Sequence, residues 1–266
     1  MPSIPTALTI AGSDSGGGAG IQADLKTFAF HQVHGTSALT CITAQNTQGV
    51  DRVDALPPEA VTAQIQTVLT DIGTHAVKTG MLLNADIIQA VAQRADRLPN
   101  LVVDPVMVSR TGAQLIADEA IAALKRALVP HAAVLTPNRY EAQLLSGREI
   151  DTLEDMKAAA QQILALGPGA IILKGGGFTG DLRGVDIYSD GDILAVLKTE
   201  TIDTPHTHGT GCTLSAAIAA NLALGYPMLT AVQRSKDYVT GALRHSLAIG
   251  AGQGPVGHFY PLLKES

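Results

Sequence analysis

The strongest constraint on the fold of this chain is a regular alternation of short apolar, β-branched runs with longer segments of helical period. This alternation is typical of βα units, in which a helix crosses over the sheet between parallel strands. We therefore predict an α/β fold with a mostly parallel central sheet and helices on both faces. The predicted parallel strands are Thr6–Ala11, Ser37–Thr43, His75–Lys78, Leu101–Asp104, Ala132–Leu135 and Ala170–Leu173.

Other segments complete this pattern. A Ser-Asp-Gly-Asp turn separates Ile187–Tyr188 from Ile193–Lys198, which predicts an antiparallel hairpin. Helix start signals precede Val61–Leu69 and Met156–Leu166. Glycine and proline are spread along the chain without a low-complexity stretch, so we expect a single domain over residues 1–266.

Charge and hydropathy exclude several classes of protein. The net charge is −6, and the sequence has no cluster of Lys and Arg of the kind that nucleic-acid-binding proteins carry. No stretch approaches the ~20 apolar residues that span a bilayer, and the start lacks a basic signal region, so we expect a cytoplasmic protein. Cys41 and Cys212 lie too far apart in the sequence to predict a disulfide framework or a zinc site.

Small, polar or glycine-rich residues follow every predicted parallel strand. The carboxyl ends of parallel strands meet at one edge of the sheet, where ligands bind. Any one of these segments alone is equally typical of a simple turn, but together they predict a ligand site. They are Gly12–Asp14, Gln45–Asn46, Gly80–Met81, Asp104–Pro105, Pro137–Asn138 and Lys174–Gly176.

A glycine turn, Thr207–Thr213, precedes the Ala-rich predicted helix Leu214–Leu222. Successive backbone N–H groups at a helix start point toward one anion, and the helix dipole adds partial positive charge. We therefore expect the turn to bind a phosphoryl group. The residues concerned are Gly209, Thr210, Gly211 and Cys212.

Cys212 lies in the first turn of that predicted helix. The dipole there favours a thiolate, which predicts a lowered pKa and a role as a base or as a polar wall. The alternative is that Cys212 is a small buried apolar residue, since free cysteines are among the most buried residue types.

The first loop, Gly12–Gly20, is not a known nucleotide fingerprint. Gly18 stands where a P-loop requires lysine, and no acid follows at the distance that a dinucleotide site requires. Its small residues instead allow the backbone to approach a flat substrate. We expect Asp24 to present a carboxylate to that substrate, and Gln45 a paired donor and acceptor.

Asn138 and Glu141 stand three residues apart at a predicted helix start and share one face. They are predicted to hold Mg²⁺ through water near nucleotide phosphates, joined by Asp104. The alternative is a capping box formed by Asn138 and Glu141, with Asp104 in a plain turn.

Seven motifs in fixed order between residues 12 and 220 point to a family. They are GSDSGGGAGIQADLKTF, TAQNT, KTGM, DPVM, TPNRYEA, LKGG and THGTGCTLSAAIA. In this combination the chain closely resembles the hydroxymethylpyrimidine and phosphomethylpyrimidine kinases of thiamine biosynthesis, a branch of the ribokinase-like superfamily. The resemblance implies ATP- and Mg²⁺-dependent phosphorylation of 4-amino-5-hydroxymethyl-2-methylpyrimidine, often of its monophosphate too, by a homodimer.

The resemblance also implies roles for residues. Gln45 matches the residue that reads the pyrimidine edge, and Cys212 stands beside the reacting hydroxyl, where the superfamily usually carries Asp. The matching substrate pocket comprises Gly12, Ala19 and Met81, with Asp24 in the same motif. The anion hole matches Gly209, Thr210 and Gly211, and the nucleotide side matches Lys174, Asn138 and Glu141.

Two positions depart from the family pattern, and two other functions stay open. Pro205-His206 stands where many members carry Lys, and Gly177-Phe178 stands where His is common. The closest alternative is a pyridoxal kinase, because pyridoxal also carries a hydroxymethyl group on an aromatic nitrogen ring. A more remote alternative is a pyrimidine-binding module without catalysis.

Overall fold

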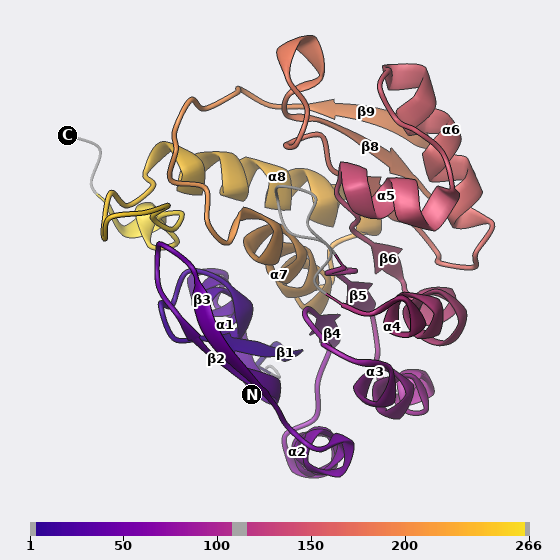
Figure 1. The fold of residues 1–266 in the computed structure, drawn as a ribbon, viewed down its shortest axis with the longest axis vertical. Coiled ribbons are helices and arrows are strands. Elements are labelled where there is room, and N and C mark those ends of the chain that lie inside the picture. Colours follow the sequence, from indigo (N-terminus) through magenta and orange to yellow (C-terminus); the bar gives the residue numbers. More distant parts are fainter. Residues whose placement is uncertain (1–3, 108–115, 264–266) are drawn as a thin grey trace.

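The computed structural model describes residues 4–107 and 116–263. Its centre is a nine-stranded sheet with the strand order β3-β2-β1-β4-β5-β6-β7-β8-β9 (Figure 1). All pairings from β2 to β7 are parallel, whereas β3, β8 and β9 pair antiparallel with their neighbours. The strands are β1 (Thr6–Asp14), β2 (His34–Gln45), β3 (Val50–Ala55), β4 (Ala76–Thr79), β5 (Leu101–Val103), β6 (Val134–Leu135), β7 (Ile171–Leu173), β8 (Val185–Ser189) and β9 (Leu194–Lys198).

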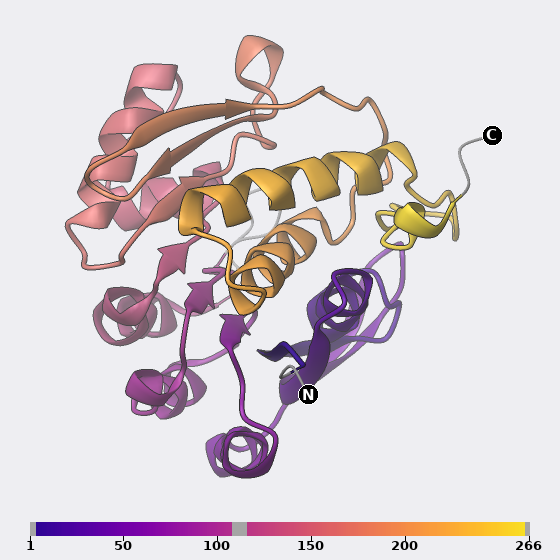
Figure 2. The ribbon, with the colours of Figure 1, turned by 180° about the vertical axis from the view of Figure 1, so that it is seen from behind.

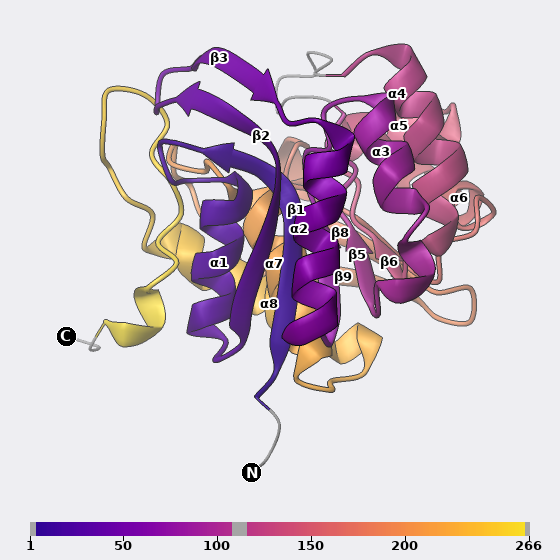
Figure 3. The same ribbon diagram turned by 90° about the horizontal axis from the view of Figure 1, so that it is seen from below.

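Helices cover both faces of the sheet. Figures 1 and 2 show α7 and α8 crossing one face, and Figure 3 shows α1 on the same side, with α2 to α6 opposite. The helices are α1 (Gly20–Phe30), α2 (Pro58–Asp71), α3 (Ala85–Ala92), α4 (Asp118–Ala123), α5 (Arg139–Ser146), α6 (Leu153–Leu164), α7 (Thr210–Ala223) and α8 (Met228–Arg244). Short turns of 3-10 or π helix are η1 (Ala95–Arg97), η2 (Leu124–Leu128), η3 (Val129–His131), η4 (Gly180–Leu182) and η5 (Tyr260–Leu262).

The sheet is buried on both faces because its side chains alternate between two hydrophobic cores. In β5, Leu101 and Val103 pack toward α2 to α6, whereas Val102 packs toward α1, α7 and α8. Continuous apolar strands of this kind are expected where helices cover both sides of a parallel sheet. The predicted α/β class is therefore confirmed.

The structure differs from the sequence prediction at several strands. β2 is longer than the predicted Ser37–Thr43, and β6 covers only Val134–Leu135. β1 continues through Asp14, because a register shift after Ala11 lets Ser13 and Asp14 pair with β2. β3 was not predicted, since all six of its residues are exposed and it has no apolar face. The predicted late hairpin is confirmed as β8 and β9. Within the described residues, no helix combines the length and the apolar character needed to cross a membrane.

Candidate active site

The carboxyl ends of the parallel strands border a cavity of about 520 Å³. This is the edge at which the sequence predicted a ligand site. An isolated parallel bridge between Asn138 and Lys174 ties two of the predicted loops together there. The predicted site residues that line the cavity are Ala19, Asp104, Asn138, Glu141, Lys174, Gly209, Thr210, Gly211 and Cys212.

The turn before α7 presents free amides to this cavity. Gly209 has φ +81°, and a Cβ there would lie 1.8 Å from the Gly18 carbonyl oxygen, so only glycine fits. Across residues 4–107 and 116–263, the amides of Gly211 and Cys212 find no hydrogen-bond acceptor. The buried hydroxyl of Thr207, which also lines the cavity, has no partner among these residues either. Unpaired donors at a helix start form a site for an anion.

The thiol of Cys212 is half-buried at the same helix start. Burial raises the pKa of Cys212 to about 11, although the nearby charge of Lys78 acts in the opposite direction. The predicted lowering of this pKa is therefore wrong. Desolvation of the thiolate outweighs the helix dipole, so Cys212 carries its proton at neutral pH.

Lys174 and Asp104 form an ion pair in the cavity, with 3.1 Å between Lys174 Nζ and Asp104 Oδ1. The hydroxyl of Ser215 donates to Asp104 Oδ2 at 3.1 Å, and that of Thr136 donates to Oδ1 at 3.3 Å. Burial opposes ionisation, but Lys174 and then Lys78 hold the pKa of Asp104 below its usual value. The pair thus brings a cation and a carboxylate to the cavity wall.

Asn138 and Glu141 form the capping box of α5. The Asn138 side chain accepts from the Glu141 amide at 3.0 Å, and Glu141 Oε2 accepts from the Asn138 amide at 2.8 Å. The capping box, which was the alternative to a metal site, is confirmed. Metal binding by these residues stays a prediction. Burial raises the pKa of Glu141 to about 8, so the apo carboxyl is protonated at neutral pH.

The donor set has limited capacity for a metal. In the part of the chain that is described, His, Cys, Asp and Glu form no group of three or more that could hold an ion. Mg²⁺ commonly keeps several waters and binds through one or two carboxylates plus substrate phosphates. Asp104, Asn138 and Glu141 therefore fit a hydrated ion shared with phosphates, not an all-protein cage.

Asp14 organises the first loop and joins it to the α7 turn. His208 Nε2 lies 2.8 Å from Asp14 Oδ2 and 3.5 Å from Gln45 Nε2, so Gln45 and the turn are on the same side of the molecule. Burial opposes ionisation of Asp14, but His208 and the loop amides lower its pKa. The amides that donate to this carboxylate are those of Gly16, Gly18 and Ala19.

The sequence reasoning missed both Asp14 and His208 as site residues. A usable signal was present, because Asp followed by a run of glycines commonly accepts hydrogen bonds from the amides that follow it. His208 lies 194 positions away from Asp14 in the sequence, so no local pattern predicts that the two residues are partners.

Gly12 and Met81 are neighbours, although neither lines the 520 Å³ cavity. A Cβ at Gly12 would lie 2.6 Å from Cys41 Sγ and 3.1 Å from Met81 Cε. Only a glycine therefore fits between these two side chains without displacing them. Gln45 is half-buried at the end of β2 and also lies outside the cavity lining.

Asp24 does not contact the cavity, so its predicted direct contact with substrate is not supported. Its side chain is 0% exposed and accepts hydrogen bonds from Lys78 at 2.8 and 2.9 Å and from Thr9 at 2.6 Å. The spacing held a signal for this: Asp24 lies three residues after Ile21 and four before Phe28, both on the buried face of α1.

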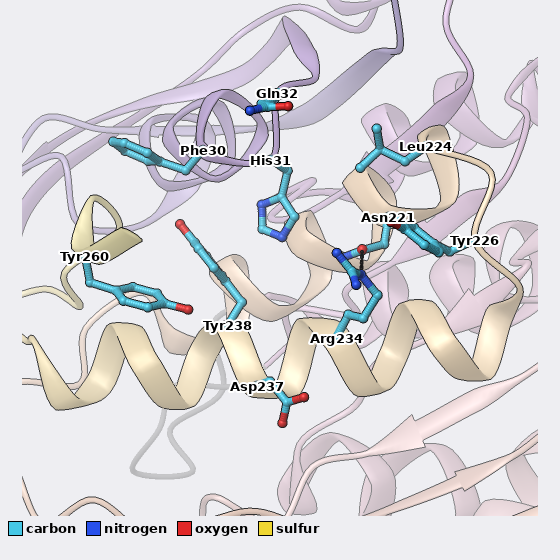
Figure 4. A pocket seen from close by; sticks show the side chains of 10 residues that line it. All are labelled: Phe30, His31, Gln32, Asn221, Leu224, Tyr226, Arg234, Asp237, Tyr238 and Tyr260. Atoms are coloured by element: carbon cyan, nitrogen blue, oxygen red, sulfur yellow. Dashed lines mark hydrogen bonds between the residues drawn. The ribbon is translucent and has the colours of Figure 1, made fainter. Parts of the chain in front are cut away.

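A second hollow of about 510 Å³ lies between the ends of α1 and α7, the side of α8 and the C-terminal segment (Figure 4). Arg234 donates to Asn221 at 2.9 Å and stacks over the Tyr226 ring at 4.3 Å. None of the predicted site residues lines this hollow. The cavity at the strand ends is therefore the candidate active site.

Comparison with solved structures finds the same fold in known kinases. An ADP complex of Bacillus subtilis pyridoxal kinase superimposes with a TM-score of 0.92 and 42% identity, over 98% of this chain and 100% of that chain. The fold places the chain in the class of ribokinase-like small-molecule kinases.

The sequence comparisons define the family within that class. The model of the phosphomethylpyrimidine kinase family matches residues 14–257, and the chain belongs to this family. A hydroxymethylpyrimidine/phosphomethylpyrimidine kinase of Synechococcus elongatus is 64% identical over 97% of this chain and 99% of the relative. A pyridoxine kinase of Bacillus subtilis is 44% identical over 96% of both chains.

Proposed function

We propose that the protein transfers the γ-phosphoryl group of ATP to the hydroxymethyl group of 4-amino-5-hydroxymethyl-2-methylpyrimidine, and then phosphorylates the monophosphate, in thiamine biosynthesis. The observation that carries the proposal is the pair of unengaged amides at Gly211 and Cys212, in one cavity with Lys174. The relative from Synechococcus elongatus, which bears the name of this activity, supports the choice of substrate.

The residues divide the work of phosphoryl transfer, which depends mainly on positioning and charge stabilisation. The free amides of Gly211 and Cys212 receive the migrating phosphoryl group, whereas the Thr210 amide already donates to the Thr207 carbonyl oxygen. Lys174, whose Nζ lies next to Gly211, offsets the charge of the phosphoryl group. Cys212, protonated at neutral pH, positions the substrate hydroxyl, and only its minor thiolate form can take the proton of that hydroxyl.

Asp104, Asn138 and Glu141 would hold hydrated Mg²⁺ against the nucleotide phosphates. The ion, when bound, neutralises phosphate charge. The capping box already fixes Asn138 and Glu141 relative to each other, and Ser215 fixes Asp104. These three residues are therefore held in one arrangement before the ion binds. Glu141 would lose its proton when the cation binds.

The pyrimidine would lie on the side of the first loop. Gln45 offers a donor and an acceptor to the ring edge, and Ala19 from the same loop lines the cavity. Gly12 and Met81 form the adjoining wall.

A product assay tests the proposal. Purified protein is incubated with ATP, Mg²⁺ and the pyrimidine alcohol, then with its monophosphate, and the mono- and diphosphate are detected by mass. We expect both products, and we expect Cys212→Ala to lower kcat by roughly 10²–10⁴-fold while Cys212→Asp keeps part of it. Absence of ADP formation would make a non-catalytic binding module the better description.

The second candidate substrate is pyridoxal or pyridoxine. The pyridoxine kinase at 44% identity and the pyridoxal kinase structure at TM-score 0.92 specifically favour it. Comparing kcat/KM for the two alcohols decides between them. A preference for pyridoxal above tenfold would reverse our ranking.

We also propose that the chain folds as one domain and works as a homodimer in the cytoplasm. The continuous nine-stranded sheet supports the first point. Light scattering after size exclusion tests the second, with a mass near twice 27.5 kDa expected.

A further inference from the structure

The loop that follows Lys174 is held at both ends by an ion pair from elements outside it. Asp186 Oδ1, on β8, accepts a hydrogen bond from the Gly175 amide at 2.7 Å. Asp186 Oδ2 pairs with Lys236 Nζ, on α8, at 2.6 Å. Lys236 Nζ also donates to the Gly184 carbonyl oxygen at 2.8 Å. The pair therefore contacts the backbone where the loop begins, at Gly175, and where it ends, at Gly184.

The two ends of this loop are also joined to each other. The Gly184 amide donates to the Gly175 carbonyl oxygen at 3.2 Å. A Cβ at Gly175 would lie 1.8 Å from the Val185 carbonyl oxygen, so the backbone packs tightly against the start of β8. The bond from Asp186 to the Gly175 amide fixes the loop at this narrow point.

The start of the loop borders the candidate active site. Gly176 and Gly177 line the cavity together with Lys174, and Asp186 and Lys236 line it as well. Among the residues that the structure describes, no acceptor pairs with the amide of either glycine. Successive backbone N–H groups of a turn can bind an anion. The loop therefore presents a lysine and two available amides to one space.

Stability alone is a weak explanation for the Asp186–Lys236 pair. The Lys236 and Asp186 side chains are only 9% and 7% exposed. The cost of desolvating two such charges offsets much of their mutual attraction, and apolar residues often replace a buried pair without loss of stability. The pair does fix a direction: because Lys236 engages one carboxylate oxygen, the other stays turned toward Gly175.

We propose that Asp186 and Lys236 are positioning residues for nucleotide binding: they fix residues 174–177 so that the lysine and the free glycine amides of this turn meet the phosphates of ATP. The inference rests on the proposed function, which places Lys174 beside the transferred phosphoryl group. Neither positioning residue needs to touch a phosphate, because both act through the backbone at the ends of the loop. Donors that are already in place bind an anion without the cost of ordering a loop.

Two double variants that differ by one hydrogen-bond acceptor test the proposal. Lys236→Met/Asp186→Asn and Lys236→Met/Asp186→Leu both remove the ion pair and leave no unpaired charge, but only asparagine can still accept from the Gly175 amide. Isothermal titration calorimetry with Mg²⁺ and the non-hydrolysable analogue AMP-PCP measures binding without phosphoryl transfer. We expect the leucine variant to have a Kd about tenfold above that of the asparagine variant, because a loop in the competent arrangement about one tenth of the time binds with about one tenth of the affinity.

The single variants test the cation. Lys236→Met frees Asp186 to turn away from Gly175, so it should weaken AMP-PCP binding, and Lys236→Arg, which keeps a charged donor, should bind more tightly than Lys236→Met. In kinase assays the KM for ATP should rise and the KM for the pyrimidine alcohol should not. A pair that only stabilises the fold would instead lower the amount of active enzyme, and thus the apparent kcat, at unchanged KM.

Ser235→Ala provides the matched control on the same helix. It removes the buried hydrogen bond from Ser235 to the Ala231 carbonyl oxygen, and Ser235 does not line the cavity, so the Kd for AMP-PCP should stay at the wild-type value. Equal Kd values for the two double variants overturn the proposal, as does an equal weakening by Ser235→Ala. Wild-type protein that binds AMP-PCP but does not phosphorylate the pyrimidine alcohol would count against the proposed function and leave the comparison of variants intact.

Discussion

Two lysine–aspartate pairs flank the start of α7 and differ in their access to solvent. The Asp24–Lys78 pair is fully buried, with side chains 0% exposed, whereas Asp104 and Lys174 are 4% and 14% exposed at the cavity wall. The first pair is closed off from solvent and has no opportunity to change partners. The second pair lines the cavity, so under the proposed function its members can exchange their contacts for phosphate and cation.

The largest difference is expected in stability. Lys78→Met leaves the Asp24 carboxylate buried without its cation, so it should lower the free energy of unfolding by about 3–5 kcal/mol. Lys174→Met should cost roughly 1 kcal/mol, because Ser215 and Thr136 still donate to Asp104. Urea unfolding measures both. Equal losses would show that the distinction between the two pairs is not real.

Enzyme activity should show the reverse order: it should depend more on Lys174 at the cavity than on the buried Lys78. Lys174→Met should lower kcat/KM for ATP by about 10²–10³-fold, because it removes a positive charge next to the transferred phosphoryl group. The exposed Lys198 provides the control, as Lys198→Met makes the same chemical change away from the site. A loss below threefold for Lys174→Met would remove this lysine from the proposed mechanism.

Gly209 and Gly211 in the turn before α7 should also differ in their effects on stability and on ATP binding. A Cβ at Gly209 clashes with the Gly18 carbonyl at 1.8 Å, whereas at Gly211 it lies 3.4 Å from Lys174 Nζ. Gly209→Ala should therefore lower the melting temperature by several degrees, with a destabilisation of about 1–3 kcal/mol. Gly211→Ala should keep the wild-type melting temperature and raise the KM for ATP a few-fold. Matching thermal scans would contradict the assignment of strain to Gly209.

The last effect concerns pH, and it accumulates gradually over several pH units. With the folded pKa of Glu141 near 8 and its usual value at 4.5, the folded state binds more protons between these values. The contribution of Glu141 to stability is thus complete below pH 4.5 and is lost as pH rises to 8. For each unit of pH within this interval, Glu141→Gln should gain a few degrees in melting temperature relative to wild type, because wild type loses about 1.4 kcal/mol per unit. A constant difference from pH 5 to 8 would exclude the raised pKa.

The sequence was sufficient for the parts of the molecule that repeat a local pattern. Alternating apolar runs predicted the parallel strands, and the glycine turn at Gly209 predicted the helix start with free amides. The polar residues after the strands were correctly expected at one edge. These features depend on spacing within a short segment, which is why they were predictable.

What failed depended on burial and on distant partners. The pKa of Cys212 was predicted from the position of this residue in the helix alone. Burial of the thiol is the largest effect, and it raises the pKa. The role of Asp24 required knowing which face of α1 is covered. A lysine inside the apolar run of β4 was the overlooked sign that a buried counter-ion must exist.

The contact between His208 and Asp14 also has a consequence for chain synthesis, because it joins residues 194 positions apart. The first glycine loop leaves the ribosome long before its partner is made, and N-terminal segments fold first during translation. The Asp14 carboxylate, which accepts hydrogen bonds from the loop amides, must then stay solvated until the turn before α7 leaves the ribosome. A nascent chain that stops short of residue 208 would hold all nine strands described here and still lack the contact that joins the first loop to the turn before α7.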